Sequence, residues 1–149
     1  MRRLILALAS NGGLGYAPVA PGTFGSLAGI PAYYLMGDLS PAGYAGIWTV
    51  LLAVSFWAAE QAGRIFGVAD DGRIVIDELV GYLVAVAFLP FSWSSALLGF
   101  LLFRVFDVVK LPPAGWIDRN WKNGIGVVLD DVVAGLYSAA ALRIFLAFL

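Results

Sequence analysis

The sequence predicts an all-α membrane protein, a compact set of antiparallel helix hairpins that gathers its polar residues on one side. Composition is the first reason, because the 149 residues are 61% hydrophobic and only 13% charged, whereas about 25% of residues are charged in a typical soluble domain. Distribution is the second, since long uncharged runs alternate with short polar stretches. A chain of this length usually forms one domain, so we expect residues 1–149 to be a single domain.

Missing residue types exclude several chemistries. The chain has no cysteine and no histidine, so it has no thiolate nucleophile, no Ser-His-Asp triad and no zinc site of the usual Cys/His type. Its net charge of -1 offers no basic face to a phosphate backbone, which excludes nucleic acid as a partner. Carboxylates remain, and their hard oxygens suit Mg²⁺ or Ca²⁺, with Mg²⁺ favoured beside phosphate.

The N-terminal part predicts a loop that leads into a short helix. The apolar run Leu4 to Ala9 follows a basic start but is too short for a cleavable signal peptide. Gly and Pro dominate Ser10 to Ser26, and an apolar helix is expected over Leu27 to Met36, capped by Thr23 or Ser26. A glycine-rich loop of this kind can offer backbone N–H groups to an anion, although a plain turn and cap explain it equally well.

A second apolar helix should pair with the first as a hairpin. A Gly-Asp-Leu-Ser-Pro turn over 37–41 ends the first helix, and 17 uncharged residues follow from Gly43 to Ala59. The run continues into Glu60 and Arg64, whose i, i+4 spacing suits the end of a helix at an interface. A polar turn over 66–73 then separates this hairpin from the next apolar segment.

The longest uncharged run, Leu79 to Phe103, has 25 residues and could form one membrane span of about 20 residues. A single straight helix would place Glu78 and Arg104 about 40 Å apart, too far to share a site. The run is interrupted by Pro-Phe-Ser-Trp-Ser-Ser, in which proline breaks a helix and serine caps the next one. We therefore expect two antiparallel helices, over 74–89 and 94–110.

These hairpins place the charges at one end of the molecule. The turns at 37–41 and 90–94 should lie together on the opposite side. The charged side should hold six cations: Arg64, Arg73, Arg104, Lys110, Arg119 and Lys122. Because cytoplasmic segments of membrane proteins are enriched in Lys and Arg, we expect this side to face the cytoplasm.

The stretch from 103 to 131 contains most of the charged residues that could bind a ligand or take part in a reaction. Arg104, Asp107 and Lys110 recur at i, i+3 and i+6 and therefore lie close to one helix face. A Pro/Gly-rich loop with further charges follows. Asp130 and Asp131 then open the last apolar helix, expected over 126–149, where a charge is costly unless it is paired or holds an ion.

Two acidic pairs are each followed by a glycine one helical turn later. Gly81 follows the pair Asp77-Glu78, and Gly135 follows Asp130-Asp131. Because glycine lets helices approach closely, the two pairs are expected to face each other and to bind a metal ion. The alternative is that the acids are neutralised by Arg73, Arg104 and Arg119.

Three motifs carry a resemblance to a known family. They read A-P-V-A-P-G-T-F-G-S-L over 17–27, I-V-I-D-E-L-V-G over 74–81, and F-R-V-F-D-V-V-K-x-x-P with G-x-G-V-V-L-D-D-V-V-A-G over 103–135. In order and length they closely resemble the signatures of phosphatidylglycerophosphatase A, across nearly the whole chain. One departure is Leu111, where the family usually has a proline after the lysine, and it concerns loop geometry rather than charge.

The resemblance implies a Mg²⁺-dependent lipid phosphatase in the bacterial cytoplasmic membrane that converts phosphatidylglycerophosphate to phosphatidylglycerol and phosphate, with its active site facing the cytoplasm. We expect the acids to form the catalytic and metal site, with Glu78 as a ligand or general base: Asp77, Glu78, Asp107, Asp130 and Asp131. We expect cations and hydroxyls to bind the phosphate of the substrate: Thr23, Ser26, Arg104, Lys110 and Arg119. The acids are adjacent pairs on helices without a D-x-D motif, which favours attack by water over an aspartyl-phosphate.

Two other classes remain open at this point. A non-enzymatic membrane scaffold explains the hydropathy but not the convergence of acids and bases. A CDP-alcohol phosphotransferase also uses membrane aspartates and magnesium, but its D-G-x-x-A-R…G…D-x-x-x-D spacing is absent from the chain.

Overall fold

The structure, a computed structural model, describes all 149 residues and contains α-helices and no strand, which confirms the predicted all-α class. A single 3₁₀ turn, η1, covers Leu14–Tyr16. The eight helices are α1 (Arg2–Ala9), α2 (Pro21–Leu27), α3 (Gly29–Met36), α4 (Pro41–Phe66), α5 (Ile76–Ala85), α6 (Trp93–Val109), α7 (Ala114–Asn120) and α8 (Gly124–Ala147).

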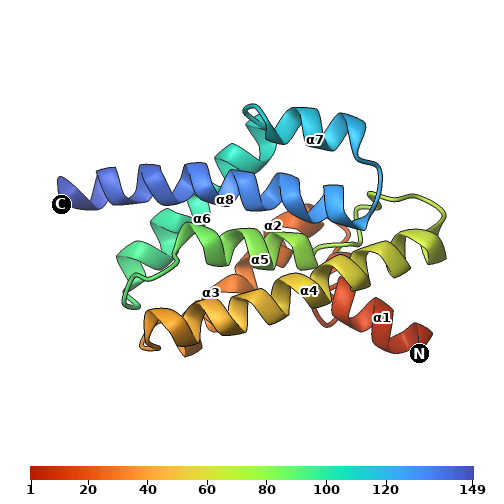
Figure 1. Cartoon of the computed structure of the whole chain (residues 1–149), viewed down its shortest axis with the longest axis horizontal. Coiled ribbons are helices and arrows are strands. Elements are labelled where there is room, and N and C mark those ends of the chain that lie inside the picture. The colour runs from red at the N-terminus through yellow and green to blue at the C-terminus, as the bar shows by residue number, and fades with distance from the viewer.

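Helices α4, α5 and α8 lie side by side along the longest dimension of the molecule, with α5 between the other two (Figure 1). Helix α6 crosses α8 obliquely, α7 packs on α8, and α1 packs on α4. The N-terminus and the C-terminus lie at opposite ends of the long dimension. Helix α5 is therefore packed against other helices on several sides, and its first turn lies inside the bundle.

The two longest helices have clear start signals. Ser40 accepts a hydrogen bond from the Gly43 N–H at 3.1 Å and caps α4, and Asn123 caps α8 by accepting from the Gly126 N–H at 2.9 Å. Helix α4 ends at Gly67, which has the left-handed φ of +77° that glycine adopts without a steric penalty. Both helices are long and apolar enough to cross a membrane.

The predicted break in the longest uncharged run is present, but α5 is shorter than predicted. It ends at Ala85 instead of 89, while α6 lies within one residue of its predicted bounds. Phe88 has a left-handed φ of +63°, and the residue before a proline avoids the helical region, so the chain turns before Pro90. With 10 residues, α5 is about 15 Å long and covers about half of a bilayer core.

The two predicted turns meet at the end of the molecule opposite the charges, where a Cβ atom on Gly37 would lie 2.9 Å from the backbone nitrogen of Phe91. The Tyr33 hydroxyl donates a hydrogen bond to the Pro90 carbonyl at 2.8 Å. The rings of Tyr44 and Phe88 lie 5.4 Å apart. Arg143 donates to the Ala87 carbonyl at 2.5 Å, so one cation lies at this end and is tied to the backbone of the turn.

Two predictions about loops were wrong. The segment 21–27 is the helix α2 rather than a loop, because Pro21 at its first position already has a helical φ and needs no N–H donor there. Neither Thr23 nor Ser26 caps a helix, since the N-cap of α2 is Ala20 and α3 follows with Ala28 as its N-cap. The Pro/Gly-rich loop after α6 also contains a helix, α7, which follows its prolines and packs on α8.

Candidate active site

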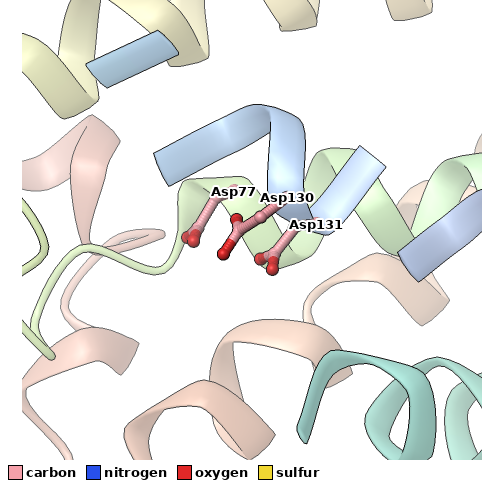
Figure 2. A group of neighbouring side chains, drawn as sticks. All are labelled: Asp77, Asp130 and Asp131. Atoms are coloured by element: carbon pink, nitrogen blue, oxygen red, sulfur yellow. The ribbon is translucent and has the colours of Figure 1, made fainter. Parts of the chain in front are cut away.

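Five carboxylates from three helices converge in the centre of the charged end. Asp77 and Glu78 lie in the first turn of α5, Asp107 lies near the end of α6, and Asp130 and Asp131 lie in the second turn of α8. Figure 2 shows the side chains of Asp77, Asp130 and Asp131 next to one another, with their carboxylates turned toward the same side of the α5–α8 pair. The structure thus brings together all five acids that the sequence singles out.

Close packing of α5 on α8 brings the acidic pairs together, as the sequence predicted from its two glycines. A Cβ atom on Gly81 would lie 2.6 Å from the carbonyl oxygen of Asp131. A Cβ atom on Gly135 would collide with the carbonyl oxygen of Gly81. Neither contact leaves space for a side chain, so glycine at both positions sets the distance between the two helices.

The carboxylate oxygens lie at distances that suit a cation. One oxygen from each of Asp77, Asp130 and Asp131 lies within 4.8 Å of the other two, and the same holds for Glu78, Asp107 and Asp131. The three residues Asp77, Asp130 and Asp131 are only 6%, 4% and 2% exposed. Four buried oxygens have no hydrogen-bond partner: Asp77 Oδ1, Glu78 Oε2, Asp130 Oδ1 and Asp131 Oδ2.

These orphaned oxygens are the test of whether the cluster fits a metal ion. Burying a carboxylate without a partner is strongly unfavourable, so native proteins pair such groups or bind an ion with them. The donor set consists of carboxylates only, which is the chemistry of Mg²⁺ and Ca²⁺ sites. The residues therefore fit the Mg²⁺ that the family resemblance implies.

Two cations border the acids. Arg104 forms an ion pair with Asp107 Oδ2, and Lys110 Nζ lies 2.9 Å from Asp130 Oδ2 and 3.7 Å from Asp107 Oδ1. Lys110 ends α6 with a left-handed φ of +52°, a conformation that is uncommon outside glycine and is held here by its surroundings. The predicted alignment of Arg104, Asp107 and Lys110 is confirmed by these ion pairs.

The other arginines do not neutralise the cluster. Arg73 pairs with Asp71 at 2.8 Å, and its hydrogen bonds hold the pKa of Asp71 below the usual value. Arg119 lies exposed on α7 and forms no ion pair. The alternative in which Arg73, Arg104 and Arg119 balance the acids is therefore wrong for two of its three arginines.

Helix α2 forms one wall of the site. A Cβ atom on Gly22 would lie 2.8 Å from Glu78 Oε1 and 3.2 Å from an Arg104 guanidinium nitrogen, so this glycine gives the backbone close access to both side chains. Ser26 is fully buried, and its hydroxyl donates to the Gly22 carbonyl at 2.8 Å. Thr23 lies partly exposed in the first turn of α2, beside Gly22.

Sequence reasoning missed two residues that hold the site in place. Asn11 donates its side-chain amide to the carbonyls of Val75 at 3.0 Å and Gly25 at 3.3 Å, and so ties the start of α5 to α2. Glu60 pairs with Arg64 as predicted, but it also accepts a hydrogen bond from the Gly124 N–H, at 2.6 Å, at the start of α8. The only signal in the sequence is the type of residue, a polar side chain at the end of an apolar segment.

Comparison with known proteins agrees with the motifs. A family model described as phosphatidylglycerophosphatase A matches residues 7–146. A phosphatidylglycerophosphatase A from Escherichia coli (strain K12) is 39% identical over 136 residues, covering 91% of this chain and 79% of that protein. Another from Haemophilus influenzae (strain ATCC 51907 / DSM 11121 / KW20 / Rd) is 37% identical over 133 residues, covering 88% of this chain and 82% of that protein.

A relative with a different, provisional name is also similar. Its name is "Putative phosphatidylinositol-3-phosphatase", it comes from Bacteroides thetaiotaomicron, and it is 36% identical over 136 residues, which cover 85% of this chain and 83% of that protein. No solved structure shows significant similarity to the chain. The match along nearly the whole chain, together with the convergence of the three motifs on one carboxylate cluster, shows that the chain belongs to the phosphatidylglycerophosphatase A family.

Proposed function

We propose that the protein is a Mg²⁺-dependent phosphatase that hydrolyses phosphatidylglycerophosphate to phosphatidylglycerol and phosphate in phospholipid synthesis. The observation that carries the proposal is the cluster of five carboxylates with four unpartnered buried oxygens, bordered by Arg104 and Lys110. Two relatives at 37–39% identity are named for this activity. The chemistry of the cluster suits a phosphomonoester, and the names of these two relatives support phosphatidylglycerophosphate as the lipid.

The acids would hold the ion between α5, α6 and α8. Asp77, Asp130 and Asp131 offer one set of oxygens, and Glu78 and Asp107 extend it on the side of α6. When bound, Mg²⁺ supplies positive charge that stabilises the negative charge on the phosphate oxygens during the reaction. Packing of α5 on α8 through Gly81 and Gly135 keeps these ligands in a fixed arrangement before substrate arrives.

Arg104 and Lys110 would bind and orient the phosphate. Each is a donor with positive charge at the border of the cluster, and the guanidinium of Arg104 can contact two phosphate oxygens at once. Both currently contact carboxylates that bear negative charge, as they would contact a phosphate. Gly22 leaves the α2 backbone close to Arg104 and so bounds the space that the headgroup enters.

Glu78 would act as the general base. Its Oε1 atom lies on the α2 side of the cluster, beside Gly22 and Arg104, and would accept a proton from the attacking water, while Oε2 is the oxygen left for an ion. The water oxygen forms a bond to phosphorus, the bond between phosphorus and the glycerol oxygen breaks, and that oxygen takes up the proton that Glu78 accepted and leaves as the alcohol. The products are phosphatidylglycerol and inorganic phosphate, so atoms and charge balance.

The site lies where a lipid headgroup would be at a membrane surface. An uncharged segment of α8 follows Asp131 directly, whereas the uncharged residues of α4 run to Glu60, which contacts Gly124 about two helical turns before Asp131. Cations crowd at this end, which favours a cytoplasmic orientation in the bacterial inner membrane. A phospholipid could then keep its acyl chains in the bilayer while its phosphate reaches the acids.

Phosphate release from purified protein tests the proposal directly. We expect turnover of phosphatidylglycerophosphate with Mg²⁺, loss of turnover with chelator and recovery on adding Mg²⁺ back. Phosphatidylinositol 3-phosphate is the comparison substrate, because one relative carries that name. Inactivity toward both lipids with Mg²⁺ present would favour a scaffold, and activity that requires CMP would favour a phosphotransferase.

A further inference from the structure

The two carboxylate groups of the cluster share one residue. Asp77, Asp130 and Asp131 form one group whose oxygens lie within 4.8 Å of one another, and Glu78, Asp107 and Asp131 form the other. Asp131 alone belongs to both. We infer that the cluster holds two divalent cations side by side, with Asp131 as their shared ligand. This inference deepens the proposed function and rests on it, since it concerns the same site.

The unpartnered oxygens are divided between the two groups. Asp77 Oδ1 and Asp130 Oδ1 are on residues of the first group, Glu78 Oε2 is on a residue of the second, and Asp131 Oδ2 is on the shared residue. Asp77, Asp130 and Asp131 are all more than nine-tenths buried. One cation in the first group would leave Glu78 Oε2 without a partner, and one in the second would leave two aspartate oxygens unpartnered.

The positions of the cations Lys110 and Arg104 leave the inner oxygens available for metal ligation. Lys110 binds Asp130 through Oδ2, so Oδ1 of Asp130 remains without a partner and available to an ion. Arg104 binds Asp107 through Oδ2, and Lys110 is 3.7 Å from Oδ1, too far for a hydrogen bond, which leaves Oδ1 free for the second group. Each cation thus orients one carboxylate, in the way that outer-shell partners orient metal ligands.

The charge of the cluster also favours two ions. Counted over these seven side chains alone, five carboxylates and the two cations in ion pairs with them leave a formal charge of -3, and the nearby Asp70 and Asp118 outweigh Lys122 and make the surroundings more negative. One divalent ion would change the charge of the seven side chains to -1, which repels a phosphomonoester whose own charge is about -1.5 to -2. Two ions would give +1, which attracts it. Sites with two metal ions about 3.5–4 Å apart are common in phosphatases and stabilise both the attacking and the leaving oxygen.

Manganese binding to the purified full-length protein tests the pair without relying on turnover. Mn²⁺ is a paramagnetic substitute for Mg²⁺, and two ions that share a carboxylate give an exchange-coupled electron paramagnetic resonance spectrum. We expect two Mn²⁺ per wild-type chain, a coupled spectrum, and displacement of both ions by excess Mg²⁺. One Mn²⁺ per chain at saturation, or two with the spectrum of isolated ions, overturns the inference.

Two variants assign the positions. Asp107→Asn should bind one Mn²⁺ and give the electron paramagnetic resonance spectrum of an isolated ion, because only the second group loses a ligand. Asp131→Asn should lose the exchange coupling between the two ions. Asp38→Asn, which changes an exposed acid at the opposite end, is the control and should keep the coupled pair. A coupled spectrum in Asp131→Asn overturns the shared ligand, and the wild-type result stands even if a variant fails to fold.

The same preparation separates this inference from the proposed function. Phosphate release with a single bound ion overturns the pair and supports the function. A coupled pair in a protein that releases no phosphate from any lipid phosphomonoester supports the pair and contradicts the function. The two conclusions therefore fail on different measurements.

Discussion

Asp77 and Asp131 face each other across the closest contact of α5 and α8 and are almost fully buried. Changing either to asparagine keeps the shape of the side chain but removes a negative charge from the proposed ion site. We expect each variant, Asp77→Asn and Asp131→Asn, to lower kcat at least about a hundredfold, because about 3 kcal/mol of transition-state stabilisation corresponds to that factor. Steady-state phosphate release with Mg²⁺ measures the effect. Near-normal turnover in either variant would remove that residue from the site, and Asp38→Asn is the matched control.

Arg104 and Lys110 are expected to act on the substrate rather than on insertion into the membrane. Losing a hydrogen bond to a charged group costs about 1.5–3 kcal/mol, so Arg104→Ala and Lys110→Ala should each lower kcat/KM about tenfold to a hundredfold. Both proteins should still be recovered folded from the membrane fraction. Arg2→Ala, at an exposed cation in α1, should leave kcat/KM unchanged. Recovery of the first two variants only as aggregate would show that these cations stabilise the fold instead.

At the scale of residues, the sequence predicts which acidic side chains meet, but it does not predict all the hydrogen bonds that hold their helices in place. Acids on apolar helices need partners, so the convergence of Asp77 and Asp131 could be predicted from their burial cost together with the glycine that follows each acidic pair. The contacts of Asn11 and Glu60 could not, because both bind backbone groups of distant segments. Almost every residue carries a backbone N–H and a carbonyl, so the sequence does not show which of these groups a given side chain will bind.

At the scale of elements, the glycines of α5 and α8 set the spacing of the active site. Gly135→Ala would put a methyl group against the Gly81 carbonyl and move the helices apart. Overpacking of this kind costs about 1–3 kcal/mol, and a shift of about 1 Å at a reacting centre can cost a hundredfold in rate. We expect lower thermal stability and a large loss of turnover, measured by unfolding in detergent and by phosphate release.

Gly46→Ala is the control for this prediction. Gly46 also lies in a long apolar helix, but a Cβ atom there meets nothing within 4 Å. Its stability should not fall, because alanine favours a helix more than glycine does. If Gly135→Ala behaves like Gly46→Ala, then close contact of α5 with α8 does not determine the activity.

Helix bounds were predictable where hydrophobic runs end in caps and breakers, as in α4, α6 and α8. They were not predictable for α2 and α7, which are seven residues each. Helices this short are not stable by propensity and form because they pack against longer helices. Gly25 illustrates this for α2, since a Cβ atom there would lie 2.5 Å from the side chain of Val75, a contact that depends on the whole fold.

At the scale of the molecule, the polarity of the two ends follows from the hairpins. The far end joins α3 to the turn after α5 through Tyr33 and Pro90, and the charged end joins α4 to α8 through Glu60 and Gly124. This arrangement was predictable, because a helix broken in its middle must return to the side it came from. The length of α5 was not predictable, since the left-handed turn at Phe88 makes the helix end four residues before the predicted end at 89.

The two ends are expected to lie on opposite sides of the membrane. The chain has no cysteine, so single cysteines can be placed by Asp38→Cys, Ser94→Cys and Gly72→Cys, all at exposed positions. These sites avoid the capping residues Ser40 and Ser92, whose loss would cost about 1 kcal/mol each. The first two sites lie at the far end, and Gly72 lies in the loop between α4 and α5.

An impermeant maleimide should therefore label positions 38 and 94 from one side of sealed vesicles and position 72 from the other. The cation-rich end predicts that position 72 is the cytoplasmic one. Phosphate release by each variant serves as the control that the fold is intact. Labelling of all three positions from one face would mean that α4 and α8 lie in the membrane surface or enter it without crossing. In that case the carboxylates would still meet the headgroup layer, but the assignment of a cytoplasmic face would lose its basis.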